Sequence, residues 1–229
     1  AANNAPVITS HGGGDSASVI VAEDTMGVNT VTATDPDAGD TQTFSIVGGA
    51  DAAKFSINST TGVLAFISAP NFEAPTDADG NNIYEVTVRV TDRGGLSDTQ
   101  AIAVTVIDQN DVAPTITSGA TGSEAENTAT SSVVYDANAT DPDTVGTVAF
   151  SLTGTDAGRF SINSATGEVT FLASPDFEAP TDADANNLYE VVVHANDGVH
   201  DTTRAVTIAV TNVNDAPVTT AVTLAAVDE

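Results

Sequence analysis

The sequence contains no cysteine and no tryptophan, and only 5 of its 229 residues are lysine or arginine. Without cysteine the chain has neither disulfides nor thiolates, so a domain that works outside the cell would need another cross-link, such as a metal ion. The 32 aspartates and glutamates give a formal net charge of −27, which repels phosphate backbones and anionic lipid surfaces. We therefore expect no nucleic-acid partner and no membrane insertion of this segment.

Intrinsic disorder is the simplest explanation of such an acidic chain, but 41% of the residues are hydrophobic and many lie in alternating runs. No stretch resembles a signal peptide, and none reaches the roughly 20 apolar residues of a membrane-spanning helix. We expect the chain to be a folded fragment of a longer protein.

The sequence repeats itself with a spacing of about 105 residues, which is the size of one domain. Residues 70–86 (PNFEAPTDADGNNIYEV) differ from residues 175–191 (PDFEAPTDADANNLYEV) at three of seventeen positions. The eight phenylalanines fall into matched pairs, as expected if both copies build the same core. We predict a first repeat over 1–112, a second over 113–217, and the start of a truncated third over 218–229.

Short runs rich in Val, Ile and Thr, with a period of two residues, predict β-strands in each repeat. Examples are 83–91 and 99–107, a further run is expected near 30–33, and a single helical turn near 51–54. Seven or eight such runs between turn clusters indicate an all-β fold of two tandem Ig-like Greek-key β-sandwiches with antiparallel strands. The cysteine and tryptophan signature of antibody domains is absent, so only the wider group of Ig-like sandwiches fits.

Carboxylates gather at the expected loops and strand ends, and several lie two residues apart, a pattern that supplies the hard oxygen ligands of calcium. In the first copy the candidate ligands are Glu23, Asp35, Asp37, Asn71, Glu73, Asp77, Asp79, Asp92, Asp108, Asn110 and Asp111. In the second copy they are Glu126, Asp141, Asp143, Asp176, Glu178, Asp182, Asp184, Asp197, Asn212, Asn214 and Asp215.

These motifs resemble those of the cadherin family, specifically the cadherin-like repeats of large bacterial surface proteins. Residues 108–114 (DQNDVAP) are similar to the family's linker, Asp-x-Asn-Asp-Asn-x-Pro, and the family's other ligand motifs occur in order. The resemblance implies a linker that binds calcium ions between successive repeats. The implied ligands are Glu23, Asn71 and Glu73 of the first repeat, Asp108, Asn110 and Asp111 of the linker, and Asp141, Asp143 and Asp197 of the second repeat.

The chain departs from the family pattern at two positions of this junction. Asn71 stands where the family usually has Asp, which lowers the negative charge around the metals. Val112 stands where the family has Asn, but it still offers a backbone carbonyl. The second linker, 212–217, is one residue shorter, so we expect the junction after it to differ, with Glu229 as the third repeat's counterpart of Glu23.

Asp77, Asp79 and Asn81 alternate like the first ligands of a calcium loop. Position twelve counted from Asp77 is Val88, so the glutamate that completes an EF-hand is missing, and the second copy fails likewise at Val193. Either an additional calcium ion or a solvated turn fits this run.

Carboxylates crowded at one junction would repel one another, on the order of several kcal/mol, and divalent ions bound from both sides would turn this repulsion into a clamp. The leading hypothesis is therefore a calcium-rigidified extender segment of a bacterial cell-surface adhesin, which projects a ligand-binding tip in cell adhesion or biofilm attachment. The alternative is a repeat that itself binds a surface polysaccharide or another copy of the repeat. An exposed aromatic platform would favour sugar binding, but only Tyr135 lacks a counterpart in the other copy.

An enzyme is not expected. The two carboxylates of a glycosidase face each other across a cleft, whereas here the acids are duplicated in loops, and no nucleophile or phosphate-binding motif occurs. The three histidines have no metal-ligand spacing. We expect an extracellular, monomeric segment at the bacterial surface, with calcium as its cofactor and the neighbouring repeats as its partners.

Overall fold

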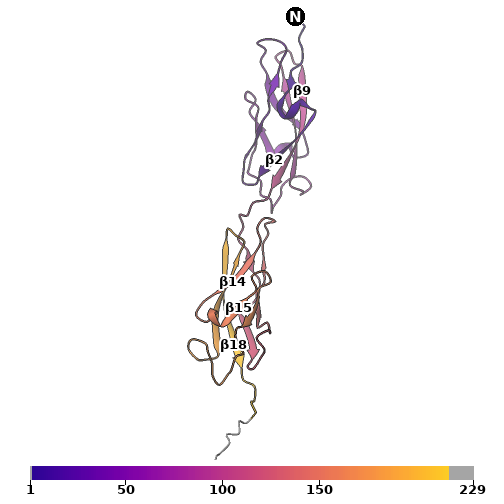
Figure 1. The fold of residues 1–229 in the computed structure, drawn as a ribbon. Helices are drawn as coiled ribbons and strands as arrows, with labels where there is room; N and C mark the ends of the chain where they lie inside the picture. Colours follow the sequence, from indigo (N-terminus) through magenta and orange to yellow (C-terminus); the bar gives the residue numbers. More distant parts are fainter. Residues whose placement is uncertain (1, 217–229) are drawn as a thin grey trace, which may run out of the picture. The chain divides into compact units, whose positions relative to one another are not determined.

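The structure is a computed structural model that describes residues 2–216. The chain divides into two compact units (Figure 1). Unit 1 holds the described residues up to Asp111 together with the short segment Pro142–Val145, and unit 2 holds Val112–Asp141 and the described residues from Gly146 onward. The expected start of a third repeat, 218–229, lies outside the described residues.

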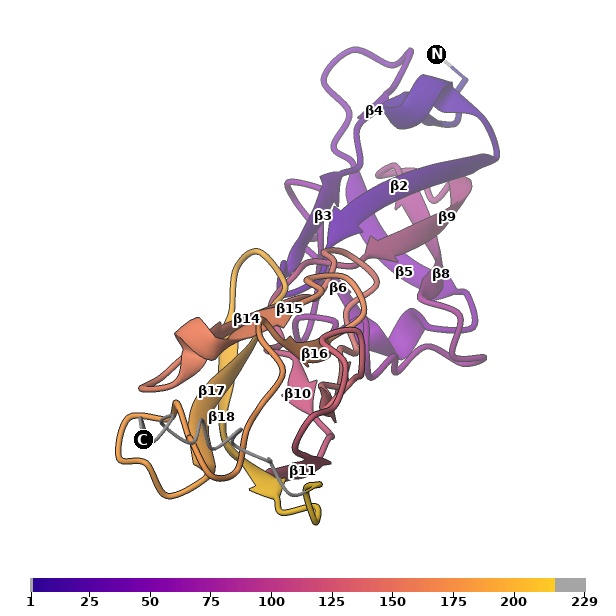
Figure 2. The same ribbon diagram turned by 60° about the horizontal axis from the view of Figure 1, so that its bottom comes forward.

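Unit 1 is a β-sandwich. Its strands are β1 (Val7–Ile8), β2 (Ser16–Ala22), β3 (Gly27–Thr30), β4 (Ala33–Thr34), β5 (Thr43–Gly48), β6 (Phe55–Ile57), β7 (Val63–Phe66), β8 (Ile83–Thr91) and β9 (Ser97–Ile107), with 3-10 helices η1 (Ser10–Gly13) and η2 (Ala52–Lys54). A four-stranded sheet has the order β2-β9-β8-β5, a three-stranded sheet the order β3-β7-β6, and β1 pairs with β4. Figure 2 shows β2 beside β9, and β2 is an edge strand of the four-stranded sheet.

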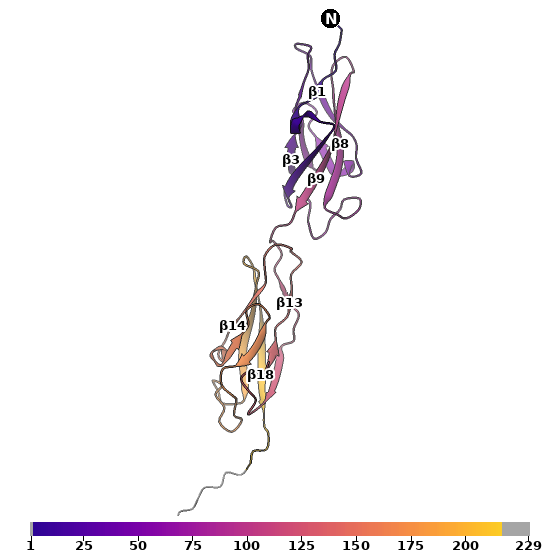
Figure 3. The same ribbon diagram turned by 45° about the vertical axis from the view of Figure 1, so that its right-hand side comes forward.

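Unit 2 repeats this architecture. Its elements are β10 (Thr115–Ile116), β11 (Thr121–Ala125), β12 (Tyr135–Asp136), β13 (Ala139–Thr140), β14 (Ala149–Thr153), η3 (Ala157–Arg159), β15 (Phe160–Ile162), β16 (Glu168–Phe171), β17 (Leu188–Asn196) and β18 (Asp201–Thr211). The sheets have the orders β11-β18-β17-β14 and β12-β16-β15, with β10 paired to β13. Figure 3 shows β14 and β18 within this unit.

Alternation along the strands produces the core. In β8, Tyr84, Val86, Val88 and Val90 are buried while their neighbours face outward, because successive side chains of a strand point to opposite faces. Their branched and aromatic side chains suit a half-buried pleated surface. In each unit, side chains of the four-stranded and the three-stranded sheet pack together in one hydrophobic cluster. The predicted all-β fold of two cadherin-like sandwiches is confirmed.

The matched aromatic residues form the same contacts in both units. The rings of Phe55 and Phe66 lie 4.6 Å apart, and Tyr84 meets Phe66 edge to face at 5.1 Å. The equivalent distances in unit 2 are 4.5 Å and 5.2 Å. Tyr135, which has no counterpart, is also buried, with 7% exposure. It therefore belongs to the core and does not offer an exposed platform.

The strand pattern differs from the prediction at the start of each repeat. In unit 1, β1 pairs with β4. The chain then crosses to the four-stranded sheet, where β2 runs parallel to β9. In unit 1 the buried Gln100 side chain fixes this crossing, because its Nε2 atom donates to the carbonyls of Ser10 and Gly14. The single strand expected near 30–33 is likewise divided into β3 and β4, which pair with different partners.

None of the helices in the described part of the chain has the length and hydropathy that crossing a membrane requires.

Candidate metal centre

Glu23 is the buried anchor of an acidic group in unit 1. It follows the last residue of β2 and is 0% exposed. Its two carboxylate oxygens accept the backbone N–H groups of Phe72 at 2.7 Å and Gln109 at 2.8 Å. Glu23 therefore ties the loop after β7 to the segment after β9.

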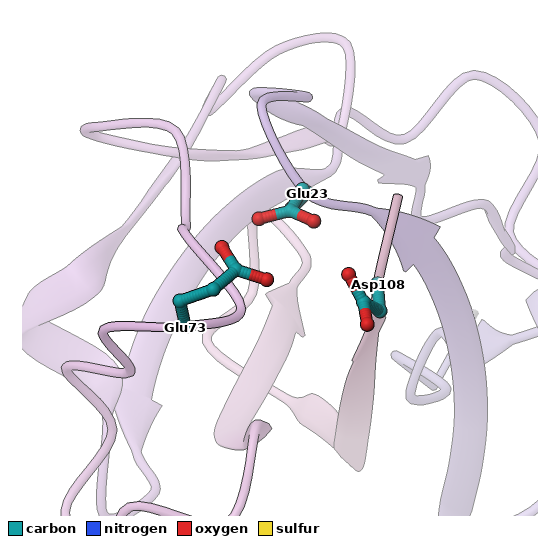
Figure 4. A group of neighbouring side chains, drawn as sticks. All are labelled: Glu23, Glu73 and Asp108. Carbon is teal, nitrogen blue, oxygen red and sulfur yellow. The ribbon is translucent and has the colours of Figure 1, made fainter. Parts of the chain in front are cut away.

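Glu73 and Asp108 bring their carboxylates to the same place. Glu73 lies in the loop between β7 and β8, and Asp108 follows β9 directly. One oxygen from each of Glu23, Glu73 and Asp108 lies within 4.8 Å of the others. Figure 4 shows these three side chains gathered at one place. Both oxygens of Glu73 and the Oδ1 atom of Asp108 are buried without an N–H or O–H donor. Carboxylates this close repel one another unless a proton or a cation lies between them.

The pKa values within this group reflect the crowding. Burial raises the pKa of Glu73 to about 7, and the negative charges of Glu23, Asp108 and Asp143 act in the same direction. Burial also opposes the ionisation of Asp108, but the hydroxyl and backbone N–H groups of Thr144 donate to it and hold its pKa below the usual value. The surroundings therefore disfavour the ionised form of the Glu73 carboxyl.

A second acidic group shares Glu73 with the first. It consists of Glu73, Asp111 and Asp143, with one oxygen of each within 4.8 Å of the others. Desolvation and the negative charge of Glu23 raise the pKa of Asp111. Asp143 belongs to the segment Pro142–Val145, which is part of unit 1 although the residues on either side of it belong to unit 2.

Calcium fits the donor set of these two groups. All of the grouped side chains offer hard carboxylate oxygens, which Ca²⁺ binds six to eight at a time in flexible geometry. The buried oxygens of Glu73 and Asp108 that have no donor are atoms that a bound cation would satisfy. The five residues that would hold cations here are Glu23, Glu73, Asp108, Asp111 and Asp143.

Two further acidic groups occur in the described residues. In unit 1, Asp35, Asp40 and Asp92 have oxygens within 4.8 Å of one another. Asp40 is not among the residues predicted from the sequence, although its position five residues after Asp35 in the same acidic loop is a signal. Asp37 is not a member, and accepts the backbone N–H of Asn4 at 2.7 Å.

The other group lies in unit 2 and consists of Glu126, Asp176 and Glu178. Glu126 is buried and accepts the backbone N–H groups of Phe177 at 2.9 Å and Val213 at 2.7 Å, so it repeats the role of Glu23. These bonds lower the pKa of Glu126.

Asn71 and Asp176 occupy equivalent positions but offer different atoms. The Oδ1 atom of each accepts a backbone N–H group three residues later, from Ala74 at 2.6 Å and from Ala179 at 2.9 Å. Asp176 keeps a second carboxylate oxygen beyond this turn, whereas Asn71 has only an amide nitrogen, which cannot bind a cation.

Other predicted acidic ligands belong to none of these four groups. Asp215 accepts the side-chain amide of Asn127 at 3.1 Å. Asp141 and Asp197 belong to unit 2, where Asp197 accepts the backbone N–H groups of Val199 and His200. Their participation in one site with Asn110 and the residues of unit 1 stays a prediction.

The Asp77 run forms a hydrogen-bonded turn. The carboxylate of Asp77 accepts the backbone N–H groups of Asn81 at 2.8 Å and Asn82 at 3.3 Å, and Asp79 accepts the side-chain amide of Asn81. Buried Asp51, which the sequence did not single out, accepts the N–H group of Ala78 at 2.7 Å. The same bonds recur in unit 2 around Asp182, Asp184 and Asp156. These contacts favour the turn over an additional calcium ion.

Comparison with known proteins relates both units to one family. Residues 18–107 and 121–213 match the cadherin domain family. The chain is 30% identical over 193 residues to human Protocadherin-23, a match that covers 82% of this chain and 5% of that protein. It is 32% identical over 202 residues to the Protocadherin-like wing polarity protein stan of Drosophila melanogaster, again covering 82% of this chain and 5% of the relative. The chain thus spans about a twentieth of the length of these relatives.

Solved cadherin structures share the fold. The crystal structure of human Protocadherin-24 EC1-2 matches with a TM-score of 0.72 at 23% identity, covering 93% of this chain and 100% of that chain. Mouse Cadherin-23 EC22-24 matches with a TM-score of 0.65 at 24% identity, covering 92% of this chain and 65% of that chain.

Cadherin domains are extracellular adhesion modules and not enzymes, and they bind calcium at the linkers between repeats. The resemblance predicted from the acidic motifs is thus confirmed at the level of the family, whereas the bacterial origin stays a prediction, since the relatives named above are animal proteins. The chain belongs to the cadherin domain family and consists of two tandem cadherin repeats.

Proposed function

We propose that this chain is a calcium-stiffened spacer within a longer extracellular adhesion protein. The observation that carries the proposal is the pair of acidic groups that share Glu73, in which buried carboxylate oxygens have no hydrogen-bond donor. Cations held there by Glu23, Glu73 and Asp108 would remove the repulsion among these side chains. Affinities of order 10⁻⁴ to 10⁻³ M are typical of extracellular calcium modules, so such sites would be filled outside a cell.

The stiffening follows from chain connectivity. Asp143 lies in a segment of four residues, Pro142–Val145, that is continuous on both sides with unit 2. A cation bound by Glu73, Asp111 and Asp143 would fasten this segment to unit 1, while the linker that begins at Asp108 is fastened at the same place. Two attached segments restrict the motion of unit 2 more than a single flexible linker does, because each removes conformational freedom from the chain between the units.

The setting of this spacer is a further part of the proposal. A chain with a net charge of −27 stays soluble and resists self-association. We propose that it serves in a bacterial surface adhesin as one stretch of a stalk that projects a binding tip, in cell adhesion or biofilm attachment. The second candidate function is a repeat that binds a polysaccharide itself, which a cavity of about 390 Å³ beside Lys54 in unit 1 favours.

Small-angle X-ray scattering tests the calcium-stiffened spacer. We expect calcium to raise the maximum dimension and lower the flexibility of the two-repeat chain relative to the same protein in chelator. Asp143→Asn should weaken this response. Asp79→Asn should keep it, because Asp79 is an exposed residue of the hydrogen-bonded turn. Equal dimensions and flexibility with calcium and with chelator would rule the stiffening out.

A further inference from the structure

Each unit contains a cavity at the equivalent place, lined by residues of η2 or η3 and of the loop that follows β7 or β16. In unit 1 the cavity has a volume of about 390 Å³ and extends from Lys54 to Tyr84. The equivalent cavity in unit 2, which includes Arg159, has only about 150 Å³. Ligand-binding pockets in proteins are typically about 300–1,000 Å³. Of these two equivalent cavities, only the one in unit 1 reaches this range.

The charge of the two cavities also differs. Among the described residues, Lys54 is the only charged one that lines the cavity of unit 1, whereas Arg159 shares the cavity of unit 2 with Asp176. Asn71 takes the place of that aspartate in unit 1. With asparagine in place of aspartate, the cavity of unit 1 has a net positive lining in a chain of net charge −27.

Lys54 is available to a ligand. The chain has 32 acidic residues, yet within residues 2–216 Lys54 forms no salt bridge. Its carbonyl accepts the backbone N–H of Ile67 at 2.8 Å, so the two residues are neighbours beside the cavity. Ile67 is 58% exposed and also lines the cavity. An ammonium group beside an exposed aliphatic side chain suits a ligand that has both an anionic group and an apolar face.

Tyr84 offers a buried hydrogen-bond donor to the same cavity. The residue is 1% exposed, and its hydroxyl oxygen accepts the backbone N–H of Thr76 at 3.1 Å. In unit 2 the hydroxyl of Tyr189 also pairs with the side-chain hydroxyl of Thr181 at 3.2 Å. Within the described chain Tyr84 lacks this second bond, so its O–H group has no acceptor, and a ligand in the cavity can supply one.

We propose that the cavity of unit 1 binds a sugar acid, one hexuronate unit of a polysaccharide. The single charge of Lys54 matches a monocarboxylate better than a phosphate dianion, which the surrounding acidic chain would repel more strongly. The hydroxyl of Tyr84 would donate to a sugar oxygen, while Ser68 and Thr76 line the cavity with further polar groups and Ile67 would cover a C–H face. This inference gives a ligand class and a location to the second candidate function.

Isothermal titration calorimetry of the two-repeat chain in calcium, with D-glucuronate, D-glucose and acetate as ligands, tests the assignment. We expect glucuronate to bind, and glucose, which has no carboxylate, to bind at least about tenfold more weakly, since it cannot accept a charge-assisted hydrogen bond from Lys54. Acetate has the carboxylate but no sugar hydroxyls, so we expect it to bind more weakly than glucuronate. Equal binding of acetate and glucuronate would overturn the assignment to a sugar.

Variants locate the site. Lys54→Met should lower the affinity for glucuronate by at least about tenfold, and Asn71→Asp should lower it too, because it introduces the carboxylate of unit 2. Arg159→Met is the matched control and should change nothing. Absence of glucuronate binding, an unchanged affinity in Lys54→Met, or an equal loss in Arg159→Met would overturn the proposal. The candidate calcium ligands are all acidic side chains, so Lys54→Met removes none of them and should keep the calcium response in scattering. The sugar-acid proposal and the calcium proposal can therefore fail separately.

Discussion

At the residue scale, two neighbouring glutamates of unit 1 have different roles. Glu23 is fully buried, but each of its oxygens accepts a backbone N–H group, so the fold itself supplies hydrogen-bond partners to both. Glu73 has no such donors to its buried oxygens, and its ordinary pKa of 4.5 rises to about 7. Glu23 therefore holds the backbone of the site in place, whereas the oxygens of Glu73 are the ones that a bound cation would stabilise.

This difference predicts a pH dependence of the metal-free protein. Because the pKa of Glu73 is higher in the folded chain than in the unfolded chain, the folded state binds more protons between about pH 4.5 and 7. Its contribution to the free energy of unfolding is therefore present at low pH and is lost as the pH rises through 7. In chelator we expect a higher melting temperature at pH 5.5 than at pH 8, and a smaller difference in Glu73→Gln. A melting temperature that rises over this range to the same extent in both proteins would contradict the assignment.

At the scale of elements, the loops that join the strands carry both the acidic groups and the turns, and sequence pattern alone does not separate them. Asp77 and Glu73 lie four residues apart in the same loop between β7 and β8. The oxygens of Asp77 accept backbone N–H groups of its own turn, whereas those of Glu73 face other carboxylates. The directions of the backbone N–H groups therefore decide which acid stabilises the loop by hydrogen bonds and which is left to bind a cation.

Asp77→Ala tests this distinction. Loss of the two backbone hydrogen bonds should lower the free energy of unfolding by roughly 1–3 kcal/mol, by the same amount in calcium and in chelator. Urea unfolding under both conditions measures the effect, and Asp182→Ala in unit 2 is the matched variant with the same bonds. A loss seen only in calcium would instead favour an additional calcium ion in this loop.

At the scale of the whole molecule, the proposed clamp requires residues from distant parts of the chain to act together. Asp111 and Asp143 belong to the same acidic group, with Glu73 as the third member. Their effects on a shared cation cannot be independent, because removal of either ligand weakens the site that the other needs.

A double-mutant cycle measures this coupling. We expect Asp111→Ala and Asp143→Ala each to reduce the rise in melting temperature that calcium produces, and the double variant to lose less than the sum of the two losses. In chelator both substitutions should have little destabilising effect, since they remove negative charge from a crowded group. Additive losses that are the same with and without calcium would show that the two residues do not share a cation.

The sequence by itself determined the repeat, the all-β class and the family, because strand alternation, duplicated aromatic residues and acidic motifs are local or periodic features that survive without coordinates. It also identified Glu23, Glu73 and Asp108 as ligand candidates, which the structure brings together. Only the tertiary structure decided which oxygens lack donors, that the remote Asp92 joins Asp35 and Asp40, and that the first strand of each repeat divides between two sheets. Those outcomes depend on backbone N–H directions and on distances between remote segments, and no local pattern encodes either.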